Sequence, residues 1–298
     1  TGENNPAFVH TGPFANIAHG TASVNATDMA LRLCDYAVIE AGFGSDLGGE
    51  KFFDIVSRHK SMNPPDAVVI VATLRAVKHH GGVKQKDLQN KDIEAVKKGF
   101  SNLEKHIENM QSFKRNVIVA INRFKDDSDE ELEALLSLCL EKEKNSFITD
   151  VYGKGSEGIM NCAEAVIKAS DKEQGDVDYV YDLTDSIEEK VKKVSYRIYG
   201  AFGIAVPKKV KEKMHKIEEW GYKDIPICIA KTQYSFSDNE KLLGRPRNFN
   251  IEVRDLKVSG GAEFVVVYLG NIMTMPGLPD KPASMKMSID DEGNVKGM

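Results

Sequence analysis

Short apolar stretches alternate along this 298-residue chain with longer segments in which apolar residues recur every three or four positions. The short stretches suit strands buried in a parallel sheet, whereas the three-and-four spacing is typical of amphipathic helices. Strands are expected at residues 36–40, 67–72, 116–121, 147–152 and 225–230. Because helical segments separate these stretches, the pattern predicts an α/β fold.

Helix starts and one hairpin refine this prediction. Residues 93–110 carry an apolar stripe, and the pairs Ser128 with Glu131 and Ser186 with Glu189 have the spacing of capping boxes. Further helices are expected near residues 26–34 and 207–221. Residues 249–258 and 264–269 are expected to form a hairpin around Ser259-Gly260-Gly261, which indicates a smaller α+β unit at the C-terminal end.

Composition excludes several classes of protein. The net charge of −5 argues against a nucleic-acid surface, which needs a concentrated basic face. The four cysteines are far apart in sequence, which predicts reduced thiols in a cytoplasmic protein. No apolar run reaches the ~18 residues of a membrane span. The chain starts at Thr1, inside what reads as the middle of a domain, so we expect a fragment or a processed chain.

Candidate chemistry follows the expected strands. Arg75, Lys78 and the Gly81-Gly82 pair come after residues 67–72, and ligands bind at the carboxyl ends of strands in open α/β sheets. Glu40, which ends the expected strand 36–40, and Asp46 are candidates for a magnesium ligand or for a carboxylate that orders water around a phosphate. Turn and capping roles are the alternatives for both carboxylates.

Several common sites are excluded. The sequence contains no G-x-x-x-x-G-K-[ST], and GKGSEG at residues 153–158 has the wrong spacing for a phosphate loop. The neighbouring His79 and His80 lack the i, i+4 spacing of a helical zinc pair. No grouping typical of a nucleophilic hydrolase stands out.

Six motifs identify a family. They are FVHTGPFANIAHG, VIEAGFGSDLGGEKFFDI, VATLRAVKHHGG, GYKDIPICIAKTQYSFSD, GRPRNF and IMTMPGLPDKP. In this order and spacing the chain, from about Pro6 to Met298, closely resembles formate–tetrahydrofolate ligases, also called 10-formyltetrahydrofolate synthetases. Departures from the family pattern are Leu74, Val77 and Arg123, the last at a position that is usually Ala.

The resemblance implies an ATP-dependent ligase that formylates tetrahydrofolate with formate through formyl phosphate. It implies Mg²⁺ as a cofactor, activation by a monovalent cation such as K⁺ or NH₄⁺, a homo-oligomer and a cytoplasmic location. The implied fold is a parallel-sheet portion like that of P-loop NTPases, a second α/β domain and a small α+β domain. We expect residues 1–112 to be the end of a nucleotide-binding domain without its phosphate loop. Residues 113–204 would form the folate-binding α/β domain, and residues 205–298 the small α+β domain.

The resemblance also assigns roles to residues. Phe124 matches the aromatic residue that lies against the pterin, and Tyr152 matches a position, usually Trp, on the other face of the ring. Two flat side chains suit this task because they stack on a flat heterocycle and bury its area. Arg75 and Lys78 would act on phosphates or formyl phosphate, and Glu40 on magnesium. The positions expected near the nucleotide are Asn16, Pro246, Arg247, Asn248, Thr274, Met275, Pro276 and Gly277.

The family's phosphate loop lies N-terminal of FVHTGPFANIAHG, so the missing N-terminal half of the same enzyme is the expected partner. We expect the isolated chain to be inactive as a ligase. Two alternatives remain open at this point. One is a non-catalytic module that binds folate, and the other is one subunit of a split ligase.

Overall fold

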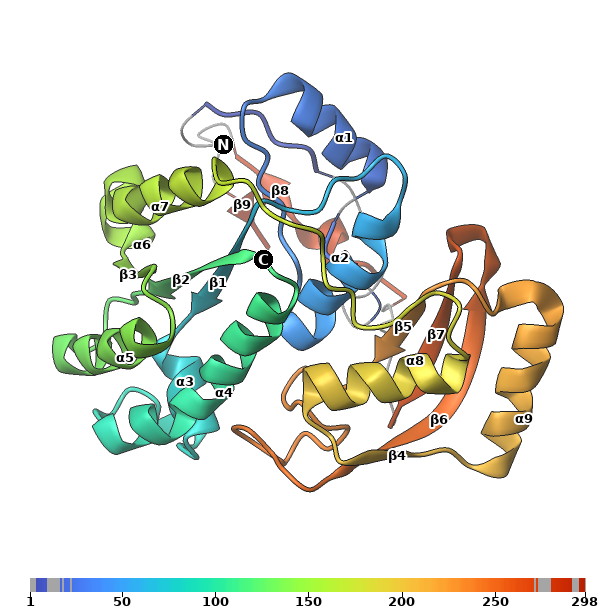
Figure 1. The fold of residues 1–298 in the computed structure, drawn as a ribbon. Coiled ribbons are helices and arrows are strands. Elements are labelled where there is room, and N and C mark those ends of the chain that lie inside the picture. The colour runs from blue at the N-terminus through green and yellow to red at the C-terminus, as the bar shows by residue number, and fades with distance from the viewer. Residues whose placement is uncertain are drawn as a thin grey trace.

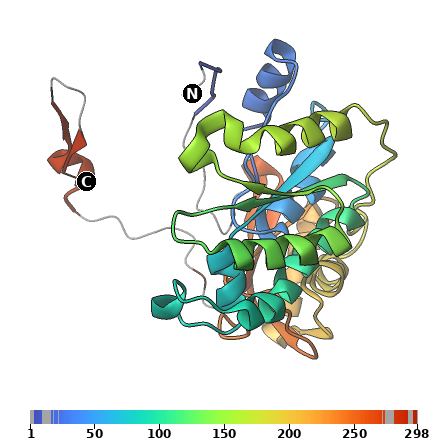
Figure 2. The same cartoon turned by 90° about the vertical axis from the view of Figure 1, so that its left-hand side faces the viewer.

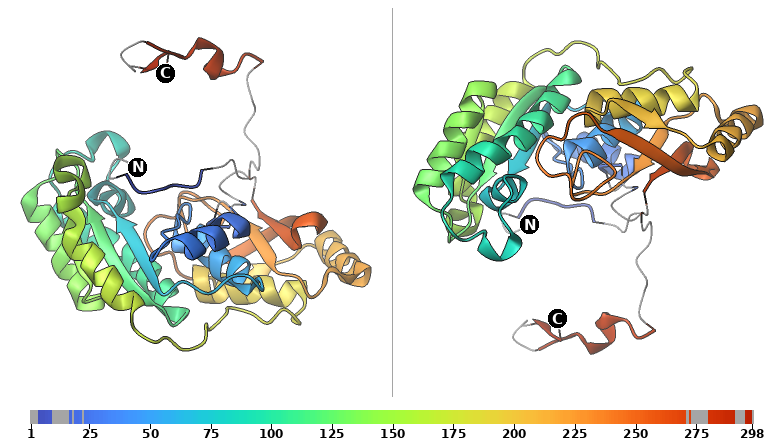
Figure 3. Two further views of the ribbon diagram at one scale, coloured as in Figure 1. Left: turned by 90° about the horizontal axis from the view of Figure 1, so that it is seen from above. Right: turned by 90° about the horizontal axis from the view of Figure 1, so that it is seen from below.

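Two β-sheets with covering helices form the body of the chain (Figure 1). The computed structural model describes residues 4–9, 17, 19–21, 23–270, 272, 280–290 and 295–297. The first sheet has three strands in the order β1-β2-β3, and the second has four in the order β4-β6-β7-β5. A short pair, β8 (Ser288–Ile289) and β9 (Val295–Lys296), lies apart from both sheets (Figures 2 and 3).

The first sheet is parallel throughout, as the apolar strand stretches predict. Its strands are β1 (Ala67–Ala72), β2 (Asn116–Asn122) and β3 (Ser146–Thr149). The helices between and after them are α3 (Leu74–His80), α4 (Ile93–Ser112), α5 (Asp129–Lys142), α6 (Val151–Lys154) and α7 (Met160–Ser170). This alternation of parallel strands and helices confirms the α/β class.

Side chains of β2 alternate between two helical layers. Val117, Val119 and Ile121 pack into the main core with the apolar stripes of α4 and α5. Ile118 and Ala120 point to the opposite face and pack with Cys162 and Ala169 of α7. Figure 2 shows α7 on one side of the sheet and α5 on the other. β2 is therefore buried on both faces, which explains its continuous apolar sequence.

The second sheet combines parallel and antiparallel pairing. It contains β4 (Gly203–Ala205), β5 (Ile227–Ala230), β6 (Asn250–Ser259) and β7 (Phe264–Leu269). β6 and β7 form the predicted antiparallel hairpin, whereas β5 pairs with β7 in parallel. The apolar side chains of α8 (Ile187–Val194) and α9 (Lys208–Ile217) share the main core with this sheet. One continuous core therefore joins both sheets.

Two further α-helices and a short helical turn precede the first sheet. They are α1 (Val24–Leu33), one turn at Ser45–Gly49, and α2 (Glu50–Asp54), of which α2 is completely buried. Ser23 caps α1 by accepting a hydrogen bond from the backbone N–H of Ala26 at 3.0 Å. Ser128 and Ser186 cap α5 and α8 in the same way, as their sequence spacing predicts.

Two glycines allow α3 to lie directly on α4. A Cβ at Gly99 would collide with the backbone carbonyl of Val77, and a Cβ at Gly81 would collide with the backbone of Ala95. Neither obstacle is a flexible side chain, so a larger residue would push the two helices apart. Gly81 is the first glycine of the HHGG sequence. Glycine is required at this position because the two helices pack closely there.

Three strand predictions differ from the structure. Residues 36–40 form no strand, and the large side chains of Tyr36 and Val38 are exposed. β1 has the expected bounds, yet Val69 and Val71 are exposed, so the expected burial on both faces is wrong. The strand expected at residues 147–152 ends at Thr149, because Asp150 caps α6 and places Tyr152 in a helical turn.

The expected domain boundaries also cross the sheets. A division at 112/113 separates β1 from β2, although β1 pairs with β2 along the full length of β1. A division at 204/205 cuts through β4, which pairs with β6. The sequence pattern could not show which strands become neighbours.

Among the described residues, the four cysteines are free thiols, and burial raises the pKa of Cys139 to about 12. Within the same part of the chain, no helix combines the length and apolar character that crossing a membrane requires.

Leu135 and Leu140 on α5 test the assignment of the core. Leu135 is fully buried, whereas Leu140 is exposed on the same helix. We expect Leu135→Ala to lower the free energy of unfolding by about 2–5 kcal/mol, since it leaves a cavity. Leu140→Ala should change it by less than about 1 kcal/mol. Urea denaturation measures both, and equal losses would contradict the core described above.

Candidate active site

The register of the first sheet brings three strand ends to one edge. Ala72 of β1 lies opposite Ile121 of β2, and Asn122 of β2 lies opposite Thr149 of β3. The backbone N–H of Arg123 donates to the carbonyl of Thr149 at 2.9 Å, which extends the pairing one residue further. The segments that follow the three strands therefore start side by side at the carboxyl edge of the sheet, where α/β proteins bind ligands.

Arg75 and Phe124 meet at this edge. Thr73 caps α3 by accepting from the N–H of Ala76 at 3.1 Å, so Arg75 lies in the first turn of that helix. The guanidinium carbon of Arg75 lies 4.6 Å from the centroid of the Phe124 ring, in the geometry of a cation–π contact. Its Nη2 is 3.9 Å from a carboxylate oxygen of Asp126. The structure thus places one expected phosphate-binding residue directly against one expected folate-binding residue.

Phe124 and Tyr152 occupy the tips of the neighbouring strands β2 and β3. The side-chain carboxylate of Asp127 accepts a hydrogen bond from the backbone N–H of Phe124 at 2.9 Å and fixes its turn. Asp150 accepts from the N–H of Gly153 at 3.0 Å and fixes the turn that carries Tyr152. Phe124 is 37% exposed and Tyr152 is 93% exposed, so both aromatic rings are accessible to a ligand.

Arg123 also lies beside this pair. Its Nη2 is 2.7 Å from a carboxylate oxygen of Asp129, in the first turn of α5. Asp126 and Asp129 therefore hold the basic side chains around Phe124, and Asp129 also provides favourable charge at the start of α5.

Lys78 was expected to contact phosphate, but it lies in a buried ion pair. Its side chain is buried, with Nζ 2.8 Å from Oε1 of Glu131 and 2.7 Å from the backbone carbonyl of Asn90. Burial acts to raise the pKa of Glu131, but the N–H of Asp92, Lys78 and the Ser128 hydroxyl outweigh it, so the pKa falls below its ordinary value of 4.5. This geometry gives Lys78 a role in joining α3 to α5 and does not support contact with a phosphate.

The two candidate magnesium ligands lie in different surroundings. Glu40 is exposed in an extended segment. Asp46 is buried, with Oδ2 2.6 Å from Nζ of the equally buried Lys231, which follows β5. Burial acts to raise the pKa of Asp46, but Lys231 and His106 together keep it below the ordinary value. Asp46 therefore has a structural partner, and the described residues contain no group of three or more metal-binding side chains.

The GRPRNF sequence is attached to the helices that follow β1. The backbone N–H of Gly244 donates to Nδ1 of His80 at 3.1 Å, and the carbonyl of Gly244 accepts from Asn102 at 2.9 Å. Burial lowers the pKa of His80 to about 4, in keeping with a neutral, hydrogen-bond-accepting imidazole. Arg245 binds Glu108 at 2.6 Å. The motif thus lies against α3 and α4.

Within that motif, Pro246 is half-buried, whereas Arg247 and Asn248 are exposed. Their exposure leaves them accessible to a ligand. The other residues expected near the nucleotide, Asn16 and Thr274, Met275, Pro276 and Gly277, lie outside the described residues.

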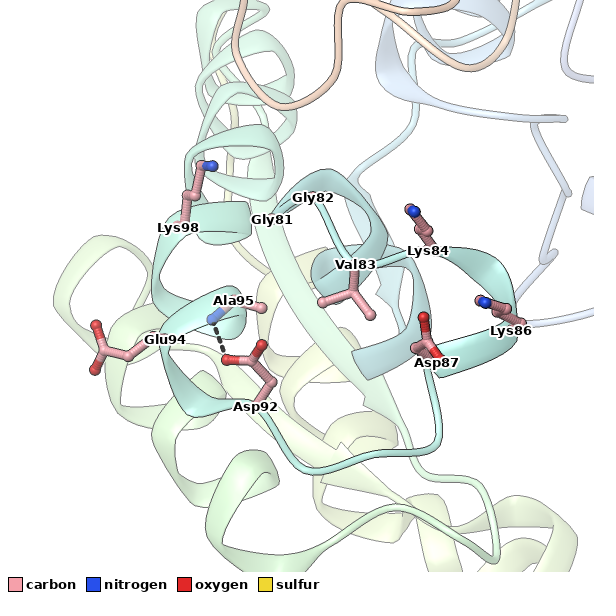
Figure 4. Close-up of a pocket in the computed structure, with 10 residues that line it drawn as sticks. All are labelled: Gly81, Gly82, Val83, Lys84, Lys86, Asp87, Asp92, Glu94, Ala95 and Lys98. Carbon is pink, nitrogen blue, oxygen red and sulfur yellow. Dashed lines mark hydrogen bonds between the residues drawn. The ribbon is translucent and has the colours of Figure 1, made fainter.

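An open cleft of about 650 Å³ lies beyond the C-terminal end of α3 (Figure 4). Gly81 and Gly82 form part of its wall, and the side chains of Lys84, Lys86 and Lys98 line it from both sides. Asp87, Asp92 and Glu94 balance these charges. Of the candidates that follow β1, the Gly81-Gly82 pair lines this cleft, whereas Arg75 and Lys78 do not.

Two buried carboxylates on α2 were not predicted from the sequence. Burial and the neighbouring Asp54 raise the pKa of Glu50 well above its ordinary value. Burial also raises the pKa of Asp54 to about 6, despite its ion pair with Arg58 at 3.1 Å. The only signal for them in the sequence is a pair of acidic residues four positions apart, with Lys51 and two phenylalanines between them.

Comparison with known proteins identifies the family of this chain. The family model of formate–tetrahydrofolate ligase matches residues 1–298. The chain belongs to the formate–tetrahydrofolate ligase family. It is 47% identical over 298 residues to a formate–tetrahydrofolate ligase from Bacillus licheniformis, and the match covers 100% of this chain and 53% of that protein. The chain thus spans about half the length of the curated relative that it matches.

Membership of the formate–tetrahydrofolate ligase family confirms the resemblance seen in the six motifs. It also gives a context for the tightly packed VATLRAVKHHGG segment. In this segment, Thr73 caps a helix, Lys78 forms a buried ion pair and Gly81 permits helix contact. Arg75 is the member of the segment that reaches the exposed edge near Phe124.

Lys78→Met tests the structural assignment of this lysine. We expect the free energy of unfolding to fall by about 3–5 kcal/mol at neutral pH, because Glu131 would remain buried without its cation. The double variant Lys78→Met/Glu131→Leu should recover part of the loss. Denaturation curves for both variants measure these effects, and a Lys78→Met protein of unchanged stability would contradict the assignment.

The stability difference between the wild type and Lys78→Met is expected to depend on pH. Because the pKa of Glu131 is lowered by folding, its stabilising contribution is complete above 4.5 and is lost as the pH falls through the folded-state pKa. The stability difference between the wild type and Lys78→Met should therefore shrink in acid.

Proposed function

We propose that this chain is the folate-binding part of an ATP-dependent ligase that converts tetrahydrofolate and formate to 10-formyltetrahydrofolate. The observation that carries the proposal is the placement of Phe124 and Tyr152 after register-paired ends of β2 and β3 in a member of this family. Aromatic rings on neighbouring strand tips can enclose a pterin and gain area burial and stacking. Tyrosine at position 152 supplies a smaller contact area than the usual tryptophan.

The proposed reaction has two steps. A formate oxygen attacks the terminal phosphorus of ATP, which yields formyl phosphate and ADP. The N10 amine of tetrahydrofolate then attacks the formyl carbon, and phosphate leaves. Arg75 is suited to this site in two ways. Its guanidinium can stabilise the negative charge of a transferring phosphoryl group, and its contact with Phe124 holds that ring in position.

The nucleotide side of the proposal rests on the exposed Arg247 and Asn248, with Pro246 beside them. The described residues do not fit a complete magnesium site, because Asp46 is paired with Lys231 and these residues contain no group of three or more metal-binding side chains. We therefore assign no step to a metal ion held by these residues. We further propose that the whole ligase is cytoplasmic, homo-oligomeric and activated by a monovalent cation.

Substitution of the two aromatic residues tests the folate clamp. We expect Phe124→Ala and Tyr152→Ala each to raise the Kd for tetrahydrofolate by roughly 5- to 100-fold, equivalent to about 1–3 kcal/mol of lost stacking and contact. Tyr196→Ala, at an exposed tyrosine near the end of α8, is the matched control and should leave the Kd unchanged. Fluorescence titration of anaerobic tetrahydrofolate measures all three. Unchanged affinity in both clamp variants would contradict the proposal.

Turnover by the chain alone tests how much of the ligase it supplies. We expect purified 1–298 to form no 10-formyltetrahydrofolate from ATP, Mg²⁺, formate and tetrahydrofolate, because the sequence contains no phosphate loop. The assay follows product formation after conversion to 5,10-methenyltetrahydrofolate, with the full-length relative as the positive control. Measurable turnover would show that the nucleotide site is complete in this chain.

A further inference from the structure

Two carboxyl groups on α2 lie inside the protein, away from the site at the carboxyl edge of the first sheet. Glu50 and Asp54 are both 0% exposed, and their spacing of four residues places them on the same face of the helix. Figures 1 and 3 show α2 between the two sheets. A buried carboxylate ordinarily accepts several hydrogen bonds, because its charge is costly to remove from water. The hydrogen bonds that reach this pair therefore decide its charge.

The donors near the pair reach one oxygen of Asp54 and neither oxygen of Glu50. The backbone N–H of Val180 donates to Oδ1 of Asp54 at 3.0 Å, and Nη2 of Arg58 donates to the same atom at 3.1 Å. Among the described residues, no donor reaches Oδ2 of Asp54 or the carboxyl oxygens of Glu50. A proton on Glu50 supplies the missing donor, since a carboxylic acid O–H can donate to a carboxylate. A side-chain hydrogen bond then links Glu50 to Asp54.

The groups around Glu50 favour this protonated form. Among the described residues, three titratable groups of other elements face it: Tyr181, Tyr199 and Cys228. Burial raises the pKa of each of them, so all three are neutral at neutral pH. Burial and Asp54 also raise the pKa of Glu50 well above its ordinary value of 4.5, because together they outweigh the opposing charges of Lys51 and Arg58.

The pair lies where a distant segment is attached to α2. Arg58 donates to the backbone carbonyl of Tyr181 at 2.6 Å, and its guanidinium carbon lies 4.0 Å from the centroid of the Tyr179 ring. The hydroxyl of Tyr181 accepts a hydrogen bond at 3.1 Å from the backbone N–H of Ile227, at the start of β5. These residues belong to the connection between α7 and α8. Asp54 and Arg58 therefore join α2 to the link between the two sheets.

We propose that Glu50 and Asp54 hold one proton between them in the folded protein at neutral pH, and that this proton makes the attachment of residues 179–181 to α2 sensitive to pH. The Glu50 hydroxyl donates to Oδ2 of Asp54, which leaves Oδ1 to accept from Val180 and Arg58. Unfolding exposes both carboxyl groups to water, where they ionise and release the proton. The proposal goes beyond the proposed ligase function and does not depend on the folate clamp.

The proton has a calculable effect on stability. Because folding raises the pKa of Glu50, its contribution to stability is complete below 4.5 and is lost as the pH rises through the folded-state pKa. Glu50→Gln keeps a donor toward Asp54 but does not titrate. The unfolding equilibrium constant of the wild type, divided by that of Glu50→Gln, should therefore rise by up to about tenfold per pH unit above 4.5. A ratio that stays flat between about pH 5 and pH 8 would contradict the proposal.

Proton release on unfolding tests the proposal directly. The 298-residue chain is unfolded with urea at pH 7 in weakly buffered solution that contains a pH indicator. We expect the wild type to release one proton more than Glu50→Gln, since the glutamine cannot carry that proton. Glu133→Gln, at an exposed glutamate of α5, is the matched control and should release as many protons as the wild type. Equal release by the wild type and Glu50→Gln would overturn the proposal.

Infrared spectroscopy of the wild type gives a readout that needs no variant. A protonated carboxyl group has a C=O stretching band that an ionised carboxylate lacks. We expect this band in the folded protein at pH 7 and its loss on unfolding at the same pH. Its absence from the folded protein would show that both groups are ionised and held by water or a cation, which would overturn the proposal.

A second variant separates the hydrogen bond from burial alone. Glu50→Leu removes the donor and leaves Oδ2 of Asp54 buried without a partner. At pH 7 its unfolding equilibrium constant should be at least tenfold larger than that of Glu50→Gln, measured by urea denaturation. Equal stability of Glu50→Leu and Glu50→Gln would show that the proton is not shared with Asp54.

Discussion

The parallel register of β1, β2 and β3 is the constraint on which the candidate site depends. Each strand ends one to three residues before a functional candidate, so a shift of one strand would move that candidate away from its neighbours. The burial of β2 on both faces fixes this register, because its side chains alternate between the α4 and α7 layers. The contact between Arg75 and Phe124 is a consequence of strand pairing between segments about fifty residues apart in sequence.

Buried charges connect the helices that support this edge. The Lys78–Glu131 pair joins α3 to α5, and the Asp46–Lys231 pair joins the turn before α2 to the end of β5. Lys78, Glu131 and Lys231 have further hydrogen-bond partners, which offset part of the cost of removing these charges from water. Such pairs tolerate little displacement. They therefore fix the relative positions of segments that the apolar core alone could accommodate in several arrangements.

Local sequence patterns predicted most helices and strands correctly, but they did not predict which segments pack against each of them. The stripe on α4, the serine caps and the β6–β7 hairpin depend on residues close together in sequence, and all three are confirmed. The prediction for residues 36–40 is wrong because apolar composition alone does not supply a neighbouring strand. Lys78 shows the same difficulty at the site, since a lysine near a strand end can bind a ligand or neutralise a carboxylate from a distant helix.

The sequence by itself determined the α/β class, the main helices and strands, and the family, because composition, periodicity and six ordered motifs are properties of the linear chain. Only the tertiary structure decided that Arg75 stacks on Phe124, that Lys78 and Asp46 form buried ion pairs, and that β1 pairs with β2. The physical reason is that strand order and charge pairing depend on contacts between distant segments. Those contacts set burial and electrostatics, which local patterns do not encode.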